Sequence, residues 1–260
     1  MARRDTRLLI LRTGHTAPEV IRRYGDYDRW FTDRMTALGC RFSVRHLPDD
    51  GVGELRGQHG ILVTGAASSV LRPEDWLRPL GELLVRSEDD GPPILAVCLG
   101  AQLAAAALGG RVERSARGWE IGTVRVDLSG EGRDDPLFDG LPDRLQVQAT
   151  HEDRIVGLPR GAILLAANRN SRVQAFGVGR RLRAVQFHPE ADAGIIRLLV
   201  QLRRARLKEE ALRRGAPDEA AAGRAVDRIE ARVRDSQDGR RILENWVRHF
   251  VSEAQKLQQR

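Results

Sequence analysis

The sequence predicts an α/β protein built on a doubly wound, mostly parallel sheet. Over the first 110 residues, short apolar runs alternate with segments of helical periodicity, a rhythm typical of βαβ units. Runs such as Pro93–Val97 are apolar throughout, which indicates strands buried on both faces. A length of 260 residues with 41% hydrophobic side chains allows one large domain with an appendage.

The first part of the chain is expected to alternate strand and helix. The expected strands are 7–11, 41–46, 60–64 and 93–97, and the expected helices are 28–38, 73–85 and 99–108. Gly39 is a stop signal for the first helix, and Pro73 suits a first helical position. Residues 48–51 are expected to form a loop after the second strand.

The alternation of strand and helix patterns ends after Gly110. Further strands, which extend the sheet or form antiparallel edges, are expected at 111–128, 144–150, 162–168, 172–178 and 181–187. From Ala191 onward the periodicity is helical, with 215–223 as a linker. We therefore expect a domain over 1–196 and a helical C-terminal extension over 197–260.

The basic charge lies mostly in this extension. The chain has 43 Lys and Arg against 36 Asp and Glu, a net charge of +7, and residues 197–260 hold 16 cationic and 10 anionic side chains. Because acidic residues are interleaved and no zinc-finger or RNA-binding motif occurs, binding to nucleic acid is not favoured. Large apolar residues such as Trp246 and Phe250 indicate that the extension packs on the domain or on a partner.

The cysteine count and the hydropathy pattern bear on the compartment. Two cysteines exclude a disulfide-stapled scaffold, and no apolar run approaches the ~20 residues of a membrane span. The apolar stretch at residues 8–11 is too short for the core of a signal peptide. We expect a protein of the reducing cytoplasm that is not bound to a membrane.

Cys98 lies where a nucleophile would be expected. An apolar strand runs into Cys98 and directly on into a helix, the layout of a nucleophile elbow. The crowded turn needs small residues two before and two after the nucleophile, and Ala96 and Gly100 meet that need. The helix N-terminus favours a thiolate, and the amide of Leu99 could donate to a developing oxyanion. An inert buried cysteine is the alternative.

A base and its orienting group are found at the end of the last strand. His188 and Glu190 are two residues apart, so on an extended segment their side chains point the same way. The intervening Pro189 restricts His188 to extended conformations. A thiol nucleophile needs a base, and the base needs an acceptor that orients it, so His188 and Glu190 suit these two roles.

The two segments together resemble a known family. The pentapeptide Cys98-Leu99-Gly100-Ala101-Gln102 and the segment Phe187-His188-Pro189-Glu190 are similar to the two signatures of the class I (triad) glutamine amidotransferases, in order and at a usual separation. The resemblance covers roughly residues 5–195 and extends to the stand-alone, GMP-synthase-like branch through residues 63–70, 118–122 and 149–153. It implies a flavodoxin-like fold and cleavage of glutamine to glutamate and ammonia through a cysteine thioester.

The resemblance also implies roles for single residues. Cys98 is the nucleophile, His188 is the base and then the acid, and Glu190 orients it. Gly65 and Leu99 supply oxyanion N–H groups, whereas Gln102 and the loop with Thr150 and Glu152 hold the substrate. Three residues depart from the pattern of the family: Ala96 replaces a glycine, Ala101 replaces a larger residue, and Glu152 stands where glycine is common.

Three functions remain open at this stage. In the first, the chain is a glutaminase that delivers ammonia to a synthetase partner, or acts as a homodimer. In the second, it is a stand-alone γ-glutamyl peptidase or hydrolase on glutathione-like or γ-glutamyl-amine substrates. In the third, it is a non-catalytic interaction protein with a basic helical tail. No phosphate-binding or zinc-binding motif occurs, so no cofactor and no metal are expected.

Overall fold

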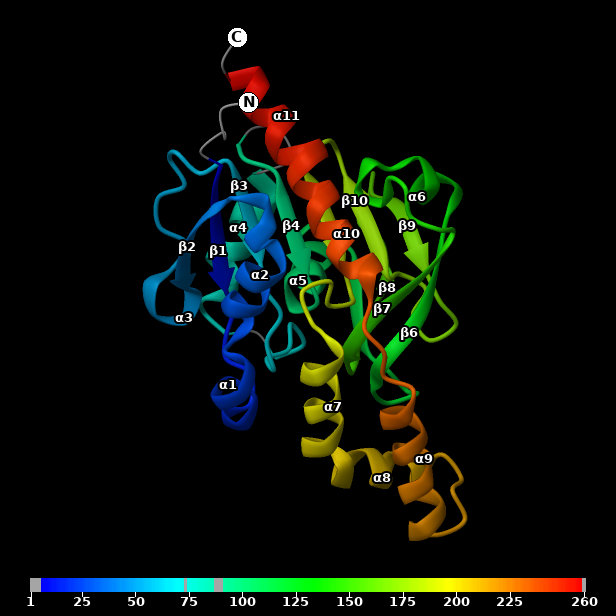
Figure 1. Ribbon diagram of the computed structural model, residues 1–260. Helices are drawn as coiled ribbons and strands as arrows, with labels where there is room; N and C mark the ends of the chain where they lie inside the picture. The colour runs from blue at the N-terminus through cyan, green and yellow to red at the C-terminus, as the bar shows by residue number, and fades with distance from the viewer. Residues whose placement is uncertain (1–5, 73, 87–90, 259–260) are drawn as a thin grey trace.

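The computed structural model describes residues 6–72, 74–86 and 91–258 and contains one large mixed sheet (Figure 1). In spatial order its nine described strands are β2 (Arg41–His46), β1 (Arg7–Arg12), β3 (Gly60–Val63), β4 (Ile94–Val97), β11 (Leu182–Val185), β10 (Ala175–Val178), β9 (Ile163–Ala167), β6 (Glu120–Leu128) and β7 (Arg144–His151). The five strands from β2 to β11 pair in parallel, and the remaining pairs are antiparallel. The predicted mostly parallel α/β architecture is confirmed.

Helices α2 and α10 lie on one face of the parallel part of the sheet, and α4 and α5 lie on the other. The described α-helices are α1 (Pro18–Tyr24), α2 (Tyr27–Met35), α3 (Leu47–Asp50), α4 (Leu77–Arg86), α5 (Leu99–Ala107), α6 (Gly130–Asp134), α7 (Ala193–Leu202), α8 (Arg204–Arg213), α9 (Glu219–Ala231), α10 (Gln237–Asn245) and α11 (Ser252–Gln258). On β1, Leu8 and Ile10 join the core beneath α2 and α10, whereas Leu9 and Leu11 join the core beneath α4 and α5. This alternation is what a doubly wound sheet requires.

Several expected elements differ in extent. The predicted strand 111–128 is two strands, because β5 (Arg111–Arg114) leaves the main sheet to pair with β8 (Asp153–Gly157), which the pattern did not predict. Residues 47–50 form the short helix α3 rather than a loop, and α1 was not predicted. The expected helix 73–85 begins at Leu77, and Pro73 lies outside the described residues.

The proposed linker 215–223 is wrong in its second half. The side chain of Asp218 accepts a hydrogen bond from the amide of Ala221 and so caps α9, which begins at Glu219. The aspartate N-cap and the glutamate in the first turn stabilise the helix more than Gly223 destabilises it. The connection between α8 and α9 is therefore only residues 214–218.

The C-terminal helices lie at two places on the sheet. In Figure 1, α7, α8 and α9 gather beyond the end to which β1 points, and α10 and α11 run along one face. A π-helix at Trp246–Val251 joins α10 to α11, and Trp246 is fully buried. Gly60 of β3 permits this approach, because a Cβ there would lie 2.9 Å from Cη2 of Trp246. None of the described helices has the length and apolarity that a membrane span would require.

Candidate active site

Cys98 sits in a strained turn between β4 and α5. Its backbone has φ 52° and ψ −103°, and it is the one non-glycine residue with positive φ in the described part of the chain. Such a conformation costs of order 1–3 kcal/mol and persists only where the surroundings enforce it. A Cβ on Gly100 would lie 2.8 Å from Cγ1 of Val63, so the small residue expected there is required by packing. The strand, turn and helix form the predicted elbow.

A β-turn brings His188 and Glu190 together. The amide of Ala191 donates to the carbonyl of His188 at 3.3 Å, which places Pro189 at the second turn position, where proline is favoured. His188 Nδ1 and Glu190 Oε1 are 2.7 Å apart, and both side chains are almost fully buried. The expected pairing is present, but it spans a turn after β11 rather than an extended segment. The amide of His188 donates to Gln148 of β7 at 2.7 Å, which ties the turn to the sheet.

The electrostatic surroundings of His188 favour its protonated form. Burial alone lowers the pKa of the imidazole, but Glu190 and Cys98 outweigh it and raise the pKa to about 10. With Nδ1 against Glu190, a protonated His188 retains a second N–H, and the ring and Cys98 both lie against Gly65. The Nε2 amide of Gln186 lies 3.8 Å from Cys98 Sγ. His188 thus lies beside Cys98 and is oriented by Glu190, the arrangement that a base needs beside its nucleophile.

Gly65 lies against the same two side chains. A Cβ added to it would meet His188 Cε1 at 2.8 Å and Cys98 Cβ at 3.2 Å. Its carbonyl accepts from the hydroxyl of Thr13 at 2.9 Å, which fixes the orientation of the peptide. Leu99 is the first residue of α5, where amides have no acceptor within the helix. The two backbones on which an oxyanion site was expected therefore flank Cys98.

The pocket over Cys98 has a volume of about 430 Å³. It is lined by residues from seven parts of the chain, namely Tyr27, Ala66, Ala67, Ser68, Ser69, Leu71, Arg72, Cys98, Gln102, Arg114, Trp119, Thr150, His151, Glu152, Asp153, His188, Arg203 and Arg206. Of the residues expected at the site, Cys98, Gln102, Thr150, Glu152 and His188 thus reach one cavity. Glu190 lies behind His188, outside this lining.

The side chains of the expected substrate-binding residues differ in the hydrogen bonds and ion pairs that they form. Gln102 donates to the carbonyl of Asp153 at 2.9 Å and to Gln186 Oε1 at 3.2 Å. The hydroxyl of Thr150 is buried without a hydrogen-bond partner. Glu152 is ion-paired at 2.6 Å both to Arg114 and to Arg206. The stretch expected as a loop is the junction of β7 and β8, with Glu152 between the two strands.

Sequence reasoning missed Gln186, Arg203 and Arg206, which lie at or next to the pocket, and gave Tyr27 no specific role. The ring of Tyr27 is stacked on that of His188 at 6.2 Å between centroids. Gln186 lies two residues before His188, and residues two apart on an extended segment point to the same side, so its position near Cys98 could have been predicted. Arg203 and Arg206 come from the C-terminal helices, and no local pattern links them to Cys98. Metal ligation has no support here, since no group of three His, Cys, Asp or Glu side chains in the described ranges could hold an ion.

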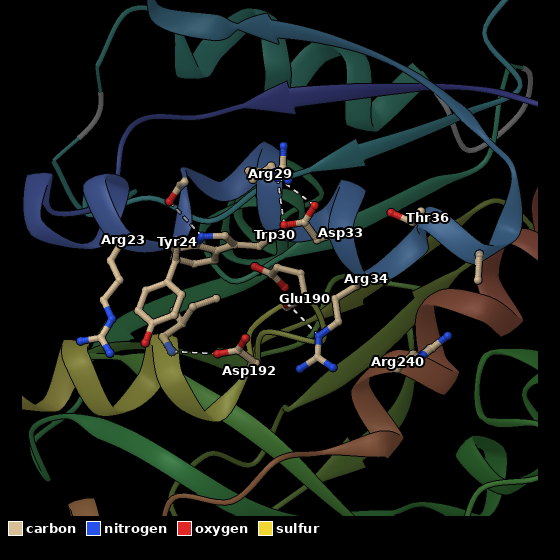
Figure 2. A pocket seen from close by; sticks show the side chains of 13 residues that line it. Arg23, Tyr24, Arg29, Trp30, Asp33, Arg34, Thr36, Glu190, Asp192 and Arg240 are labelled. Carbon is tan, nitrogen blue, oxygen red and sulfur yellow. Dashed lines mark hydrogen bonds and ion pairs between the residues drawn. The ribbon is translucent and has the colours of Figure 1, made fainter.

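A second, larger cavity of about 940 Å³ lies on the other side of Glu190 (Figure 2). Part of its wall comes from α1 and α2, through Arg23, Tyr24, Arg29 and Trp30. Arg34 donates to the carbonyls of Glu190 and Ala191 at 3.4 and 3.0 Å, and Arg29 pairs with Asp33 at 2.8 Å. No described residue lines both this cavity and the Cys98 pocket, so the two are separate. Arg34 holds the turn that contains His188 and Glu190 in place.

Comparison with known proteins places these features in context. The family model for glutamine amidotransferase class-I matches residues 19–196. Gamma-glutamyl peptidase 4 of Arabidopsis thaliana is 25% identical over 178 residues, which cover 66% of this chain and 71% of that protein. A glutamine-hydrolyzing GMP synthase of Thermotoga sp. (strain RQ2) is 34% identical over 173 residues, which cover 64% of this chain and 31% of that protein.

Solved structures agree on the fold. The crystal structure of a glutamine amidotransferase from Thermotoga maritima matches with a TM-score of 0.66 and 21% identity, covering 95% of this chain and 98% of that one. At that identity the likeness shows the fold alone. It includes most of the C-terminal helices, which lie beyond the residues that the family model matches. The chain spans about a third of the length of the GMP synthase it matches.

Proposed function

This chain belongs to the class I glutamine amidotransferase family, and from that premise we propose that it hydrolyses the γ-amide bond of a γ-glutamyl compound, glutamine in the first instance. One observation carries the proposal: Cys98 stands at a strained elbow beside His188, and His188 Nδ1 is held 2.7 Å from Glu190 Oε1. These are the parts of a nucleophile, its base and an orienting carboxylate.

The proposed reaction has two halves. In the first, Cys98 Sγ attacks the γ-carbonyl carbon, and the amides of Gly65 and Leu99 stabilise the oxyanion. The C–N bond breaks as His188 gives its proton to the nitrogen, which leaves as ammonia or an amine. In the second, His188 takes a proton from water, which attacks the thioester carbon. Glutamate is released, and the proton bound by His188 restores the starting state.

The proposed substrate contacts involve three further residues. Gln102, Thr150 and Glu152 line the pocket, and Thr150 has a buried hydroxyl free to accept or donate a hydrogen bond. Glu152 acts through Arg114 and Arg206, because its carboxylate is already paired with both. We propose that it shapes the rim rather than binding the substrate amine directly.

The fate of the nitrogen separates two versions of the proposal. As a glutaminase, the chain delivers ammonia to a synthetase partner, a version supported by the likeness to GMP synthase. As a γ-glutamyl peptidase, it releases an amine or a peptide and needs no partner, a version supported by the Arabidopsis relative. A reducing cytoplasm is the proposed compartment, because the reaction requires a free thiol at Cys98.

Purified protein incubated with glutamine, glutathione and a γ-glutamyl amine tests the proposal directly. Ammonia, glutamate and amine release are measured, with Cys98→Ala as the control. Release from glutamine directs the search to an ammonia-accepting partner, and release only from larger compounds identifies a peptidase. Absence of turnover and of Cys98 labelling by a glutamine-like electrophile would exclude a stand-alone enzyme and leave a subunit activated by its partner or the binding-protein alternative. That alternative predicts nucleic-acid binding that weakens steeply with salt.

A further inference from the structure

The C-terminal helices contribute two arginines to the pocket that contains Cys98. Arg203 lies at the junction of α7 and α8, and Arg206 lies in the first turn of α8. Both guanidinium groups lie over the ring of Trp119, at 4.5 and 5.4 Å from its centre. One wall of the pocket is therefore cationic and belongs to the part of the chain beyond the family match.

Arg203 differs from its neighbours in having no counter-ion. Arg204 is paired with Asp227 at 2.7 Å and Arg206 with Glu152 at 2.6 Å. No carboxylate of the described chain forms an ion pair with Arg203, and its Nη1 is buried without a hydrogen-bond partner. Burial is the largest influence and lowers the pKa of the Arg203 guanidinium; Tyr27 and Cys98 act to raise this pKa, and the charge of Arg206 adds to the lowering. A buried, unpaired charge is costly, so a ligand that neutralised it would gain binding energy.

Stacking on Trp119 does not satisfy Arg203. A guanidinium stacks through its flat face, whereas its five N–H donors point outward in its plane. Its planar edge matches a carboxylate, which can accept two of those hydrogen bonds at once. The buried hydroxyl of Thr150, also without a partner, lines the same cavity. The pocket thus holds two unsatisfied polar groups suited to an anionic ligand.

We propose that Arg203 is a carboxylate-binding residue of the catalytic pocket, and that the γ-glutamyl substrate presents a carboxylate to it. This inference rests on the proposed function, because it concerns the substrate of the same site. The carboxylate has two possible sources: the α-carboxylate of the γ-glutamyl group, or a carboxylate on the leaving amine. With either source, a residue of the C-terminal extension takes part in binding the substrate.

The kinetics of Arg203→Gln on four substrates test the inference. Glutamine and γ-glutamyl methylamide carry only the α-carboxylate, γ-glutamylglycine carries a second one on the leaving group, and the α-amide of glutamine carries none. Loss of a charge-assisted hydrogen bond is expected to lower kcat/KM by about 10- to 100-fold, mostly through KM. If Arg203 binds the α-carboxylate, only the α-amide escapes this loss. If it binds the leaving group, only γ-glutamylglycine suffers it.

Controls separate recognition from folding. Arg204→Gln removes a neighbouring arginine that pairs outside the pocket, and we expect it to leave all four substrates unaffected. Arg203→Lys retains the charge without the planar edge and is expected to recover part of the loss. An equal loss on all four substrates, or no loss on any, would overturn the inference.

A binding measurement distinguishes failure of this inference from failure of the proposed function. Glutamate and γ-glutamylglycine are titrated calorimetrically into Cys98→Ala protein with and without Arg203→Gln. Turnover that does not depend on Arg203 overturns the inference alone. Binding that depends on Arg203, without turnover by the wild-type protein, overturns the proposed hydrolysis alone. Absence of both binding and turnover overturns both.

Discussion

At the scale of single residues, Cys98 combines reactivity with backbone strain. Its backbone has a φ of 52°, its side chain lines the pocket while staying almost fully buried, and α5 begins at the next residue. The strain belongs to the backbone and not to the sulfur, so it should persist in any variant that keeps a Cβ. Glycine alone relieves it, because glycine has no Cβ to clash.

Cys98→Gly is therefore expected to be more stable than Cys98→Ala, although both are inactive. Relief of strain of order 1–3 kcal/mol exceeds the roughly 0.5–1 kcal/mol that glycine ordinarily costs relative to alanine. Urea denaturation of both variants measures the difference in the free energy of unfolding. A less stable glycine variant would contradict a strained elbow.

The pairing of His188 with Glu190 leads to a second prediction for single residues, which concerns how stability depends on pH. The folded pKa of His188, about 10, is above its ordinary value of 6.5. A raised pKa means that the protonated ring stabilises the fold fully below about pH 6.5, and that this contribution is lost as the pH rises toward 10. Glu190→Gln removes the carboxylate that favours the proton. We expect the difference in Tm between wild type and variant to narrow from pH 6.5 to 10.

Thermal unfolding across that pH range tests this prediction. Glu82→Gln is the matched control, because Glu82 is exposed and pairs with Arg78 on the same helix. Its difference from wild type should stay small at every pH. A Glu190→Gln difference that does not change with pH would mean that the pair is not a coupled buried ion pair.

At the scale of elements, the turn after β11 is held from outside by α2. Arg34 donates to the carbonyls of Glu190 and Ala191, so it positions the turn without contacting the Cys98 pocket. We expect Arg34→Gln to lower kcat about tenfold with little change in KM, because misplacing the orienting carboxylate weakens the base and not substrate binding.

Steady-state kinetics on whichever γ-glutamyl compound is turned over measure this effect. Arg29→Gln is the matched control: Arg29 lines the same cavity on the same helix but pairs with Asp33 instead of the turn. A rise in KM without a fall in kcat would show that Arg34 acts on binding.

How far these elements could be predicted depends on the range of the interactions that define them. The Cys98 elbow is local, since an apolar strand, small flanking residues and an immediate helix all lie within about ten residues. The meeting of His188 and Glu190 was predicted from their spacing, but the turn that joins them depends on a hydrogen bond from Ala191 and on the bridge to Gln148. Strand β8 was missed because its pairing partner, β5, lies some 40 residues earlier.

The position of Arg203 in the pocket could not be predicted from the neighbouring sequence. Nothing around it in the sequence separates it from Arg204, yet one guanidinium enters the pocket and the other pairs with α9. Arg203 is the residue between α7 and α8, whereas Arg204 is the first residue of α8, and consecutive residues of a helical chain point about 100° apart. Only the packed arrangement of the helices reveals it.

At the scale of the whole molecule, the C-terminal extension is part of the core. Ile242, Leu243 and Trp246 belong to the same buried cluster as Leu8 of the first strand. Trp246 also approaches Gly60 at the start of β3. The extension therefore covers one face of the sheet while Arg203 reaches the pocket, so the stability of the fold and the composition of the site depend on the same segment.

Trp246→Ala should consequently destabilise the entire protein. Truncating a fully buried tryptophan typically costs about 3–5 kcal/mol, out of a total of about 5–15 kcal/mol for a domain. Leu202→Ala is the control, because Leu202 is 42% exposed and its truncation leaves no buried cavity. Urea denaturation should show one cooperative transition whose midpoint falls sharply for Trp246→Ala alone. If the extension were a separate appendage, the tryptophan substitution would instead leave the main transition unchanged. Retention of Cys98 labelling by iodoacetamide below the midpoint would show that the loss is one of stability, because Trp246 does not line the pocket.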